Sequence, residues 1–253
     1  MPTSHEEWPI ETRRFGRRVL VFDELTSTND EASRSVEPVA ILARHQTSGR
    51  GRFGRVWRSR PGSALLMSVA FHPPAHLRRP SVLTAWAAVA VADVIERLAG
   101  LHARIKWPND LLVNGQKVCG ILIEQGAATV VGIGLNLSQT REEFDNAGLP
   151  RAASLASITG IEIDYRAAAE CVLKSLDDRI EQLMSDRELV EAAWRDRTEL
   201  LGREVLVDRS DGSRLSGCLL RLGFDELELE QADGERRTFL PESVEHITPG
   251  ATR

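Results

Sequence analysis

The stretch Arg104–Leu137 reads RIKWPNDLLVNGQKVCGILIEQGAATVVGIGLNL, and four apolar runs in it are separated by turns. The dipeptide Asn114-Gly115 favours a type I′ hairpin, so the flanking runs Leu111–Val113 and Val118–Glu124 are predicted to pair. Arg104–Trp107 is predicted to be a short strand that Pro108 ends, and Thr129–Leu137 is a further apolar strand. This stretch predicts several neighbouring strands of one sheet.

The same patterns extend outward on both sides of this stretch. Further strands are predicted at Arg18–Asp23, Val39–Arg44 and Leu65–Phe71. Thr28 and Glu31 fit a capping box for a helix that runs toward Val36. Ser81 is predicted to cap a helix through Leu98 that ends at Gly100. Gln139–Gly160 is predicted to be an irregular loop with a short helix, followed by helices at Tyr165–Met184 and Arg187–Leu201.

The pattern changes after Gly202. Short alternating runs at Glu204–Asp208, Leu215–Leu222, Leu227–Glu230 and Arg237–Leu240 are separated by turns such as Ser210-Asp211-Gly212. Such spacing is typical of a small antiparallel barrel or sheet. We therefore predict two domains, residues 1–201 and 202–253.

Composition excludes several classes of protein. The 253 residues carry a net charge of -5, with 42% hydrophobic and 27% charged residues, which is an ordinary globular composition. That charge argues against a protein that holds nucleic acid mainly by neutralising phosphates. The three cysteines are far apart, which predicts neither a disulfide framework nor a cysteine zinc site and favours a reducing cytosol. No signal peptide is apparent, and the apolar run Thr84–Ile95 is too short to cross a membrane.

The segment Arg44–Gly62 is the most unusual one in the chain. It reads RHQTSGRGRFGRVWRSRPG, with six arginines and no acid, and Gly49, Gly51 and Gly54 leave its backbone accessible. Guanidinium groups and bare N–H groups suit phosphate or carboxylate oxygens. The segment is therefore predicted to bind a phosphorylated or carboxylated small molecule, with a flexible solvated loop as the alternative. No helix start follows the G-x-G-x-x-G pattern, which excludes a dinucleotide-binding fold.

Two further groups of residues are candidates for chemistry. Lys106 ends a strand beside Trp107 and would suit a cleft, although a surface lysine before a turn is the alternative. Gly132 and Gly134 in an apolar strand indicate close approach by a ligand or by the chain, or else a bulge. Asn136 would then bond a base or a ribose. The chain contains neither G-x-S-x-G nor H-E-x-x-H, and its six histidines show no metal-ligand spacing.

Taken together, these segments resemble biotin protein ligases. The matching motifs are Ser27-Thr28-Asn29, Gln46-x-x-Gly-Arg-Gly-Arg-x-Gly-Arg-x-Trp57, Lys106-Trp-Pro-Asn-Asp110, Lys117-x-x-Gly120-Ile-Leu-Ile-Glu124 and Gly132-x-Gly134-x-Asn136. They occur in the order and at the spacing of the family. The resemblance implies an α+β fold, with a mixed central sheet, flanking helices and a small C-terminal SH3-like β-barrel.

The resemblance also implies a reaction, its site and its partners. Biotin would react with Mg²⁺-bound ATP to give biotinyl-5′-AMP, and a lysine of a biotin carboxyl carrier domain, as in acetyl-CoA carboxylase, would then take the biotin. The catalytic residues would be Lys106, Arg50 and Arg52. Biotin would be bound by Ser27, Thr28, Asn29, Gln46, Arg50, Gly51, Arg52, Lys106, Gly120 and Gly132. ATP would be bound by Arg52, Arg55, Trp57, Lys106, Asn109, Lys117 and Asn136, and no protein metal site is expected.

Some members of the family carry an N-terminal helix-turn-helix that binds DNA. Only 26 residues precede Ser27, so we expect a ligase without repressor function, in the cytoplasm, with no DNA or membrane partner. The oligomeric state stays open, a homodimer included. Two alternatives remain: a lipoate or octanoate transferase of the same fold, which would lack the Gly-Arg-Gly-Arg loop, and a non-enzymatic adaptor.

Overall fold

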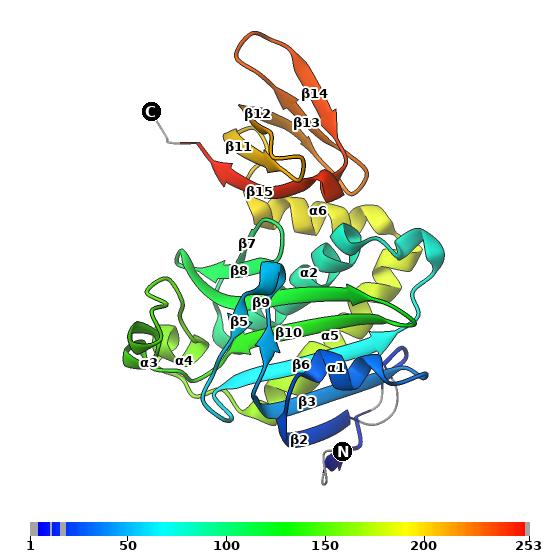
Figure 1. Cartoon of the computed structure of the whole chain (residues 1–253), viewed down its shortest axis with the longest axis vertical. Helices are drawn as coiled ribbons and strands as arrows, with labels where there is room; N and C mark the ends of the chain where they lie inside the picture. The colour runs from blue at the N-terminus through cyan, green and yellow to red at the C-terminus, as the bar shows by residue number, and fades with distance from the viewer. Residues whose placement is uncertain (1–4, 11, 16–18, 251–253) are drawn as a thin grey trace.

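A computed structural model describes residues 5–10, 12–15 and 19–250, and it contains an eight-stranded sheet, a five-stranded sheet and a two-stranded sheet with helices between and around them (Figure 1). The large sheet has the strand order β1 (Glu6–Trp8), β2 (Val19–Leu25), β3 (Val39–Gln46), β6 (Ala64–Phe71), β10 (Thr129–Asn136), β9 (Gln116–Gln125), β8 (Asp110–Val113) and β7 (Arg104–Lys106). Only the β2–β3 pair of this sheet is parallel. The predicted mixed central sheet is therefore confirmed.

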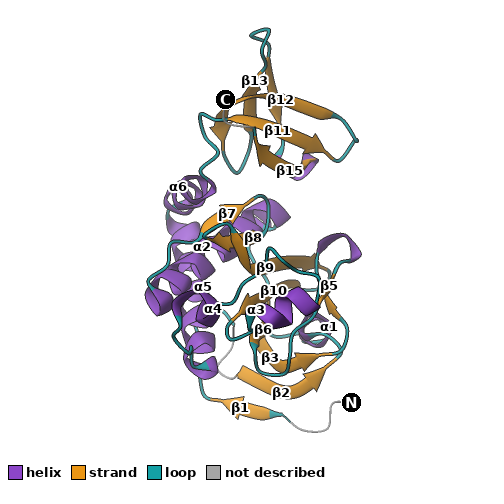
Figure 2. Ribbon diagram, turned by 90° about the vertical axis from the view of Figure 1, so that its left-hand side faces the viewer, coloured by secondary structure: helices purple, strands orange, loops and turns teal. Residues whose placement is uncertain are grey.

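Helices cover the two faces of this sheet unequally. The long helices α2 (Pro80–Ala99) and α5 (Tyr165–Ser185), with α6 (Arg187–Thr198), lie on one side, whereas the short α1 (Thr28–Ser33) lies on the other (Figure 2). Strand β6 is buried along its whole length because it is central and covered on both faces. The thin cover on the α1 side leaves that face open to polar side chains.

Two hydrophobic cores follow from this arrangement. The larger one fills the space between the sheet and the long helices, where Trp86 is fully buried against Phe15 and Phe71. The smaller one lies under α1 and includes Phe22, Ile41 and Val130. None of the described helices is long and apolar enough to cross a membrane.

The C-terminal segment forms the predicted antiparallel sheet. Its strand order is β14 (Arg236–Phe239), β13 (Leu227–Glu230), β12 (Arg214–Leu222), β11 (Glu204–Arg209) and β15 (Val244–Pro249). Strand β15 was not predicted, because its apolar residues Val244 and Ile247 are three apart and a bulge interrupts its pairing with β11. Helix α6 ends at Thr198 and β11 begins at Glu204, and the division into domains at residue 201 stays a prediction.

A row of aromatic rings joins the two parts of the chain. Trp107 packs against Trp194 of α6, and Trp194 packs against Phe224 of the C-terminal segment, with centroid distances of 5.7 and 5.4 Å. The indole N–H of Trp107 donates to the carbonyl of Val244 at 3.2 Å. The larger hydrophobic core is therefore continuous from the large sheet into the C-terminal sheet.

Two predicted helix caps were wrong. Helix α1 begins at Thr28, Ser27 is its N-cap residue without a side-chain bond, and the Thr28 hydroxyl is engaged elsewhere. In α2 the N-cap residue is Arg79 and Pro80 begins the helix, while Ser81 donates its hydroxyl hydrogen to Glu242. In both cases a distant side chain competes successfully for the hydroxyl that would have capped the helix.

Several predicted boundaries also shift. Helix α1 stops at Ser33 rather than near Val36, and Gln139–Gly160 contains two short helices, α3 (Arg141–Asn146) and α4 (Leu155–Thr159). Each of these two has a capping box, at Thr140 and Ser154, that the sequence reading missed. The arginine-rich segment Arg44–Gly62 contains a small hairpin of β4 (Gly49–Arg50) and β5 (Val56–Trp57). Arg18, where the first strand was predicted to begin, lies outside the described residues.

Candidate active site

Three glycines on β9 and β10 form the floor of the candidate site. A Cβ on Gly132 would lie 2.3 Å from Oδ1 of Asn29, and one on Gly134 would lie 2.7 Å from the Trp57 ring. A Cβ on Gly120 would lie 3.0 Å from the same ring. The predicted close approach is confirmed and is made by side chains of the chain itself. The alternative, a bulge, is excluded because β10 pairs in regular register with both neighbours.

A buried polar cluster lies over Gly132. The backbone N–H and the hydroxyl of Thr28 both donate to Oε1 of Gln46, at 2.7 and 2.9 Å. The Ser68 hydroxyl lies 2.7 Å from the Thr28 oxygen and 2.6 Å from Oδ1 of Asn29. Ser27, Thr28 and Asn29 are each no more than 4% exposed. Sequence reasoning missed Ser68 because its strand is otherwise apolar and reads as a structural core strand.

Two carboxylates border this cluster. Nδ2 of Asn29 donates to Glu124 at 2.7 Å, which fixes the amide so that its oxygen faces Ser68 and Gly132. Arg50 forms a two-pronged pair with Asp30 at 2.9 and 2.7 Å and also reaches Glu124 at 3.2 Å. Hydrogen bonding from Arg50 lowers the pKa of the Asp30 carboxyl despite partial burial. Sequence reasoning assigned no role to Asp30, which follows the Ser-Thr-Asn motif. It also assigned none to Glu124, although Glu124 is the last residue of the motif that begins at Lys117.

A second group of side chains surrounds Trp57 over Gly120 and Gly134. Nζ of Lys117 forms an ion pair with Asp110 at 2.6 Å and lies 5.7 Å from the Trp57 ring centroid. Asn109 donates to the carbonyl of Ile121 at 2.8 Å, which ties the loop before β8 to β9. The indole nitrogen of Trp57 is buried without a hydrogen-bond partner among the described residues. This group combines a cation, an aromatic face and a free N–H donor.

The two lysines of the motifs differ in their surroundings. Lys117 lies beside Trp57 and Asp110, inside the site. Lys106 is exposed at the end of β7 and borders a small cavity of about 70 Å³ with Leu200 and Ile247, and it makes no ion pair with any described residue. The predicted catalytic role of Lys106 stays a prediction, and the geometry makes Lys117 the stronger candidate.

The arginines of Arg44–Gly62 divide into two sets. Arg44 pairs with Glu6 and Asp23, Arg60 pairs with Glu143, and Arg50 pairs as described above. Within the described part of the chain Arg52, Arg55 and Arg58 make no ion pair. The sequence shows a segment without acids, but acids from distant segments neutralise half of its arginines. Three cations remain available to an anionic ligand.

Asn136 is placed differently from the expectation. It is 4% exposed, its Nδ2 donates to the carbonyl of Ala153 at 3.0 Å, and its Oδ1 accepts from Gln139 at 2.9 Å. These bonds connect the end of β10 to the segment that leads into α4. Its predicted contact with a nucleotide stays a prediction, and the contacts in this structure are structural.

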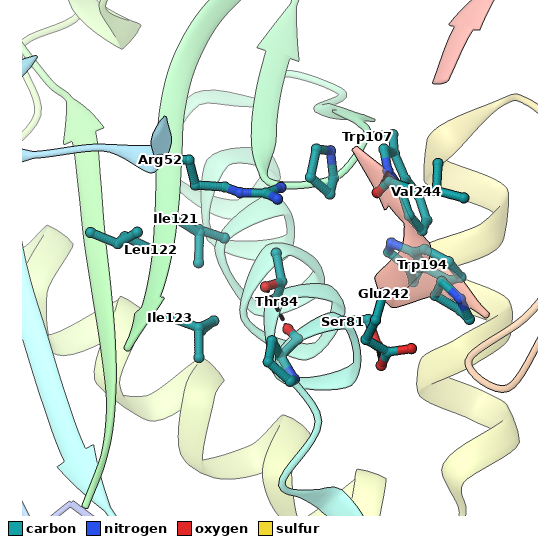
Figure 3. Close-up of a pocket in the computed structure, with 13 residues that line it drawn as sticks. Arg52, Ser81, Thr84, Trp107, Ile121, Leu122, Ile123, Trp194, Glu242 and Val244 are labelled. Atoms are coloured by element: carbon teal, nitrogen blue, oxygen red, sulfur yellow. Dashed lines mark hydrogen bonds between the residues drawn. The ribbon is translucent and has the colours of Figure 1, made fainter. Parts of the chain in front are cut away.

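A cleft of about 300 Å³ opens next to this site, between β9, the start of α2 and the C-terminal sheet. Arg52, Ser81, Trp107, Ile121, Trp194 and Glu242 are among its lining residues. Figure 3 shows the Arg52 side chain extending into the cleft. Burial lowers the pKa of Arg52, and the nearby Glu245 and Asp110 oppose that effect. No three His, Cys, Asp or Glu side chains among the described residues converge to hold a metal ion.

Comparisons with known proteins agree with this geometry. A sequence model of the Biotin/lipoate A/B protein ligase family matches residues 20–138. The biotin–[acetyl-CoA-carboxylase] ligase of Mycobacterium tuberculosis is 31% identical over 212 residues, which cover 79% of this chain and 78% of that protein. The chain belongs to the biotin protein ligase family.

Other members of the biotin protein ligase family extend the comparison. The bifunctional ligase/repressor BirA of Bacillus subtilis is 35% identical over 187 residues, which cover 70% of this chain and 58% of that protein. The chain thus spans less than two thirds of that relative. The solved structure of the biotin protein ligase of Aquifex aeolicus in complex with biotin and ATP superimposes with a TM-score of 0.77 at 24% identity. The superposition covers 92% of this chain and 99% of the Aquifex aeolicus chain, which shows a shared fold.

Proposed function

We propose that this chain is an ATP-dependent biotin protein ligase. The observation that carries the proposal is the shared floor of β10. Gly132 underlies the polar cluster and Gly134 underlies Trp57, and two strand residues span about 7 Å. A small neutral ring and a nucleotide would therefore lie side by side, with Lys117 and Arg52 next to the point where they meet.

The proposed reaction needs no protein nucleophile. A biotin carboxylate oxygen attacks the α-phosphorus of ATP, the bond to the β-phosphate oxygen breaks, and pyrophosphate leaves. The amine of a carrier lysine then attacks the biotinyl carbonyl carbon, AMP leaves with the bonding electrons, and the amine gives up a proton. Two anions must approach each other in the first step, so cations that neutralise them supply the catalysis.

The described residues suit these roles. The carboxyamide and hydroxyl groups of Gln46, Thr28, Ser68 and Asn29 both donate and accept, as the ureido ring of biotin requires. Cys119, which precedes Gly120 on β9, is fully buried in the larger hydrophobic core, and burial raises the pKa of its thiol, so it is unsuited to attack. Mg²⁺ would enter as its ATP complex, with the triphosphate supplying oxygen ligands.

Biotin-dependent exchange of labelled pyrophosphate into ATP tests the first step. We expect exchange with biotin and little with lipoate or octanoate; exchange that depends on lipoate instead would favour the transferase alternative. No exchange with any acid would contradict the proposal. Mass spectrometry of a biotin carboxyl carrier domain tests the second step, with biotin expected on one lysine. The sequence leaves the oligomeric state open, and sedimentation with and without biotin and ATP would show whether the chain forms a homodimer.

A further inference from the structure

The tip of the hairpin that spans residues 49–57 touches the C-terminal sheet. The ring of Phe53 lies against the ring of His246 in β15, with centroids 5.9 Å apart and planes at 61°. The guanidinium carbon of Arg52 lies 4.8 Å from the centroid of the same phenyl ring. Arg52, Phe53 and His246 therefore form a continuous stack between the arginine-rich hairpin and the last strand of the chain. Edge-to-face ring pairs and guanidinium stacking both stabilise such contacts.

The backbone at this tip is unusual. Phe53 has φ 57° and ψ 36°, in the left-handed region, although a residue with a bulky side chain rarely adopts it. Gly54, which adopts this region without strain, follows with φ 71°. Phe53 is 57% exposed, so packing within its own hairpin does not explain the conformation. In this conformation the Phe53 ring contacts His246, and this contact is the interaction that accounts for the unusual backbone.

The charged groups near Arg52 also favour contact between the hairpin tip and β15. Arg52 is half-buried, and it is close enough to Glu245 and Asp110 for both carboxylates to favour its charged form. Glu245 belongs to the C-terminal sheet and Asp110 belongs to the candidate site. The guanidinium is thus influenced by an acid of the sheet and by an acid of the site, and it extends into the cleft that Figure 3 shows.

We propose that Phe53 and His246 are positioning residues: their contact seats the hairpin tip on the C-terminal sheet and thereby holds Arg52 over the reacting phosphate. This inference rests on the proposed function. Phe53 occupies the first unspecified position of the motif Gly-Arg-Gly-Arg-x-Gly-Arg-x-Trp, and no biotin or ATP contact is assigned to either residue. The C-terminal sheet would therefore govern how long the adenylate is retained, without touching it.

The rate at which biotinyl-5′-AMP escapes from the enzyme tests this proposal. The adenylate is made on the enzyme from biotin and labelled ATP, and its release is followed after an excess of unlabelled adenylate is added. We expect His246→Ala and Phe53→Gly each to raise the escape rate by about three- to tenfold, the range that an aromatic pair supports. The double variant should release no faster than the faster single variant, because both remove one interaction.

Two variants separate docking from other effects. Phe53→Gly keeps the left-handed turn without strain but removes the ring, so wild-type retention in this variant would overturn the proposal. His246→Phe keeps an aromatic edge and should restore retention to within about twofold of wild type. Leu240→Ala is the matched control. Leu240 is exposed, belongs to the C-terminal segment like His246, and makes no ring contact with the hairpin. Biotin affinity, measured by calorimetry, should stay unchanged in all of them.

The outcomes also distinguish this inference from the proposed function. A wild-type protein that forms no adenylate would overturn the proposed function and this inference with it. A wild-type protein that forms and retains adenylate, together with single variants that retain it equally well, would overturn this inference alone. Additive effects in the double variant would mean that the two residues act separately, which also contradicts the proposal.

Discussion

Lys117 and Lys106 are both candidates for neutralising the charge that develops when carboxylate and phosphate react. Lys117 lies between Asp110 and Trp57, whereas Lys106 is exposed at the end of β7. A preorganised cation in a site is worth more than a solvated one, because its orientation is fixed before the reaction. The comparison of the two lysines is therefore a direct test of the site.

We expect Lys117→Ala to lower the rate of pyrophosphate exchange by about 10²–10³, the loss typical of removing one charge-stabilising donor. We expect a smaller loss for Lys106→Ala, which serves as the matched control. Circular dichroism checks that both variants fold. If Lys106→Ala loses more activity than Lys117→Ala, the catalytic role belongs to Lys106, as the motif alone suggests.

Glu124 is the residue that orients the polar cluster, because it binds both Asn29 and Arg50. We expect Glu124→Gln to weaken biotin binding by about tenfold, which corresponds to losing one charge-assisted hydrogen bond. The maximal exchange rate at saturating biotin should change little. Calorimetry and exchange kinetics measure the two quantities. Glu37→Gln, at an exposed position, is the control, and equal effects of both changes would remove the orienting role of Glu124.

At the scale of a single element, β10 acts as the floor because its glycines admit side chains from other segments. We expect Gly134→Ala to raise the KM for ATP by about tenfold. The new methyl group would lie 2.7 Å from the nearest carbons of the Trp57 ring, which is too close, so the ring would have to move. Gly126→Ala is the matched control, since a Cβ there meets nothing within 4 Å. Steady-state exchange kinetics with both variants provide the measurement. Unchanged KM in Gly134→Ala would show that Trp57 does not hold the nucleotide.

The whole molecule is held together at the start of α2 by ionic contacts as well as by aromatic packing. Arg79 binds both oxygens of Glu242 at 3.0 and 2.8 Å, and the hydroxyl of Ser81 also donates to Glu242. Burial raises the pKa of the Glu242 carboxyl, but the bonds from Arg79 and Ser81 outweigh it, so the pKa is lowered. A carboxyl with a lowered folded-state pKa stabilises the fold above its unfolded pKa and loses that effect as the pH falls through the folded value.

We expect Glu242→Gln to lower the free energy of unfolding at neutral pH by about 1 kcal/mol, a value reduced for partial solvent exposure. The difference from wild type should shrink as the pH falls below the ordinary glutamate pKa and disappear once the pH is below the lowered pKa of Glu242, where the wild-type carboxyl is protonated. Urea unfolding at several pH values measures both effects. A difference that persists at low pH would mean that packing, and not charge, accounts for the loss.

Local sequence was sufficient for most of the regular structure. The hairpin at Asn114-Gly115 formed as predicted, and both residues have positive φ, 51° and 77°. Period-two and helical patterns also predicted most strands of the large sheet, the long helices and four of the five C-terminal strands, while the mixed sheet was implied by the family resemblance. These features depend on turn chemistry and on the spacing of apolar residues, which involve only residues close together in the chain. The motifs likewise placed Gln46, Trp57 and Lys117 in one site by resemblance.

Tertiary structure alone decided which groups meet. Thr28 and Ser81 fit helix caps in the sequence, yet Gln46 and Glu242 engage their hydroxyls. Asp30 and Glu124 neutralise Arg50, and Ser68 completes the polar cluster, although no local pattern assigns these roles to any of the three. Hydrogen bonds and ion pairs form between whichever groups the fold brings within about 3 Å, and the partners here are up to 161 residues apart. Strand register and helix packing set those distances, so the hydrogen bonds and ion pairs of the site cannot be predicted from the sequence alone.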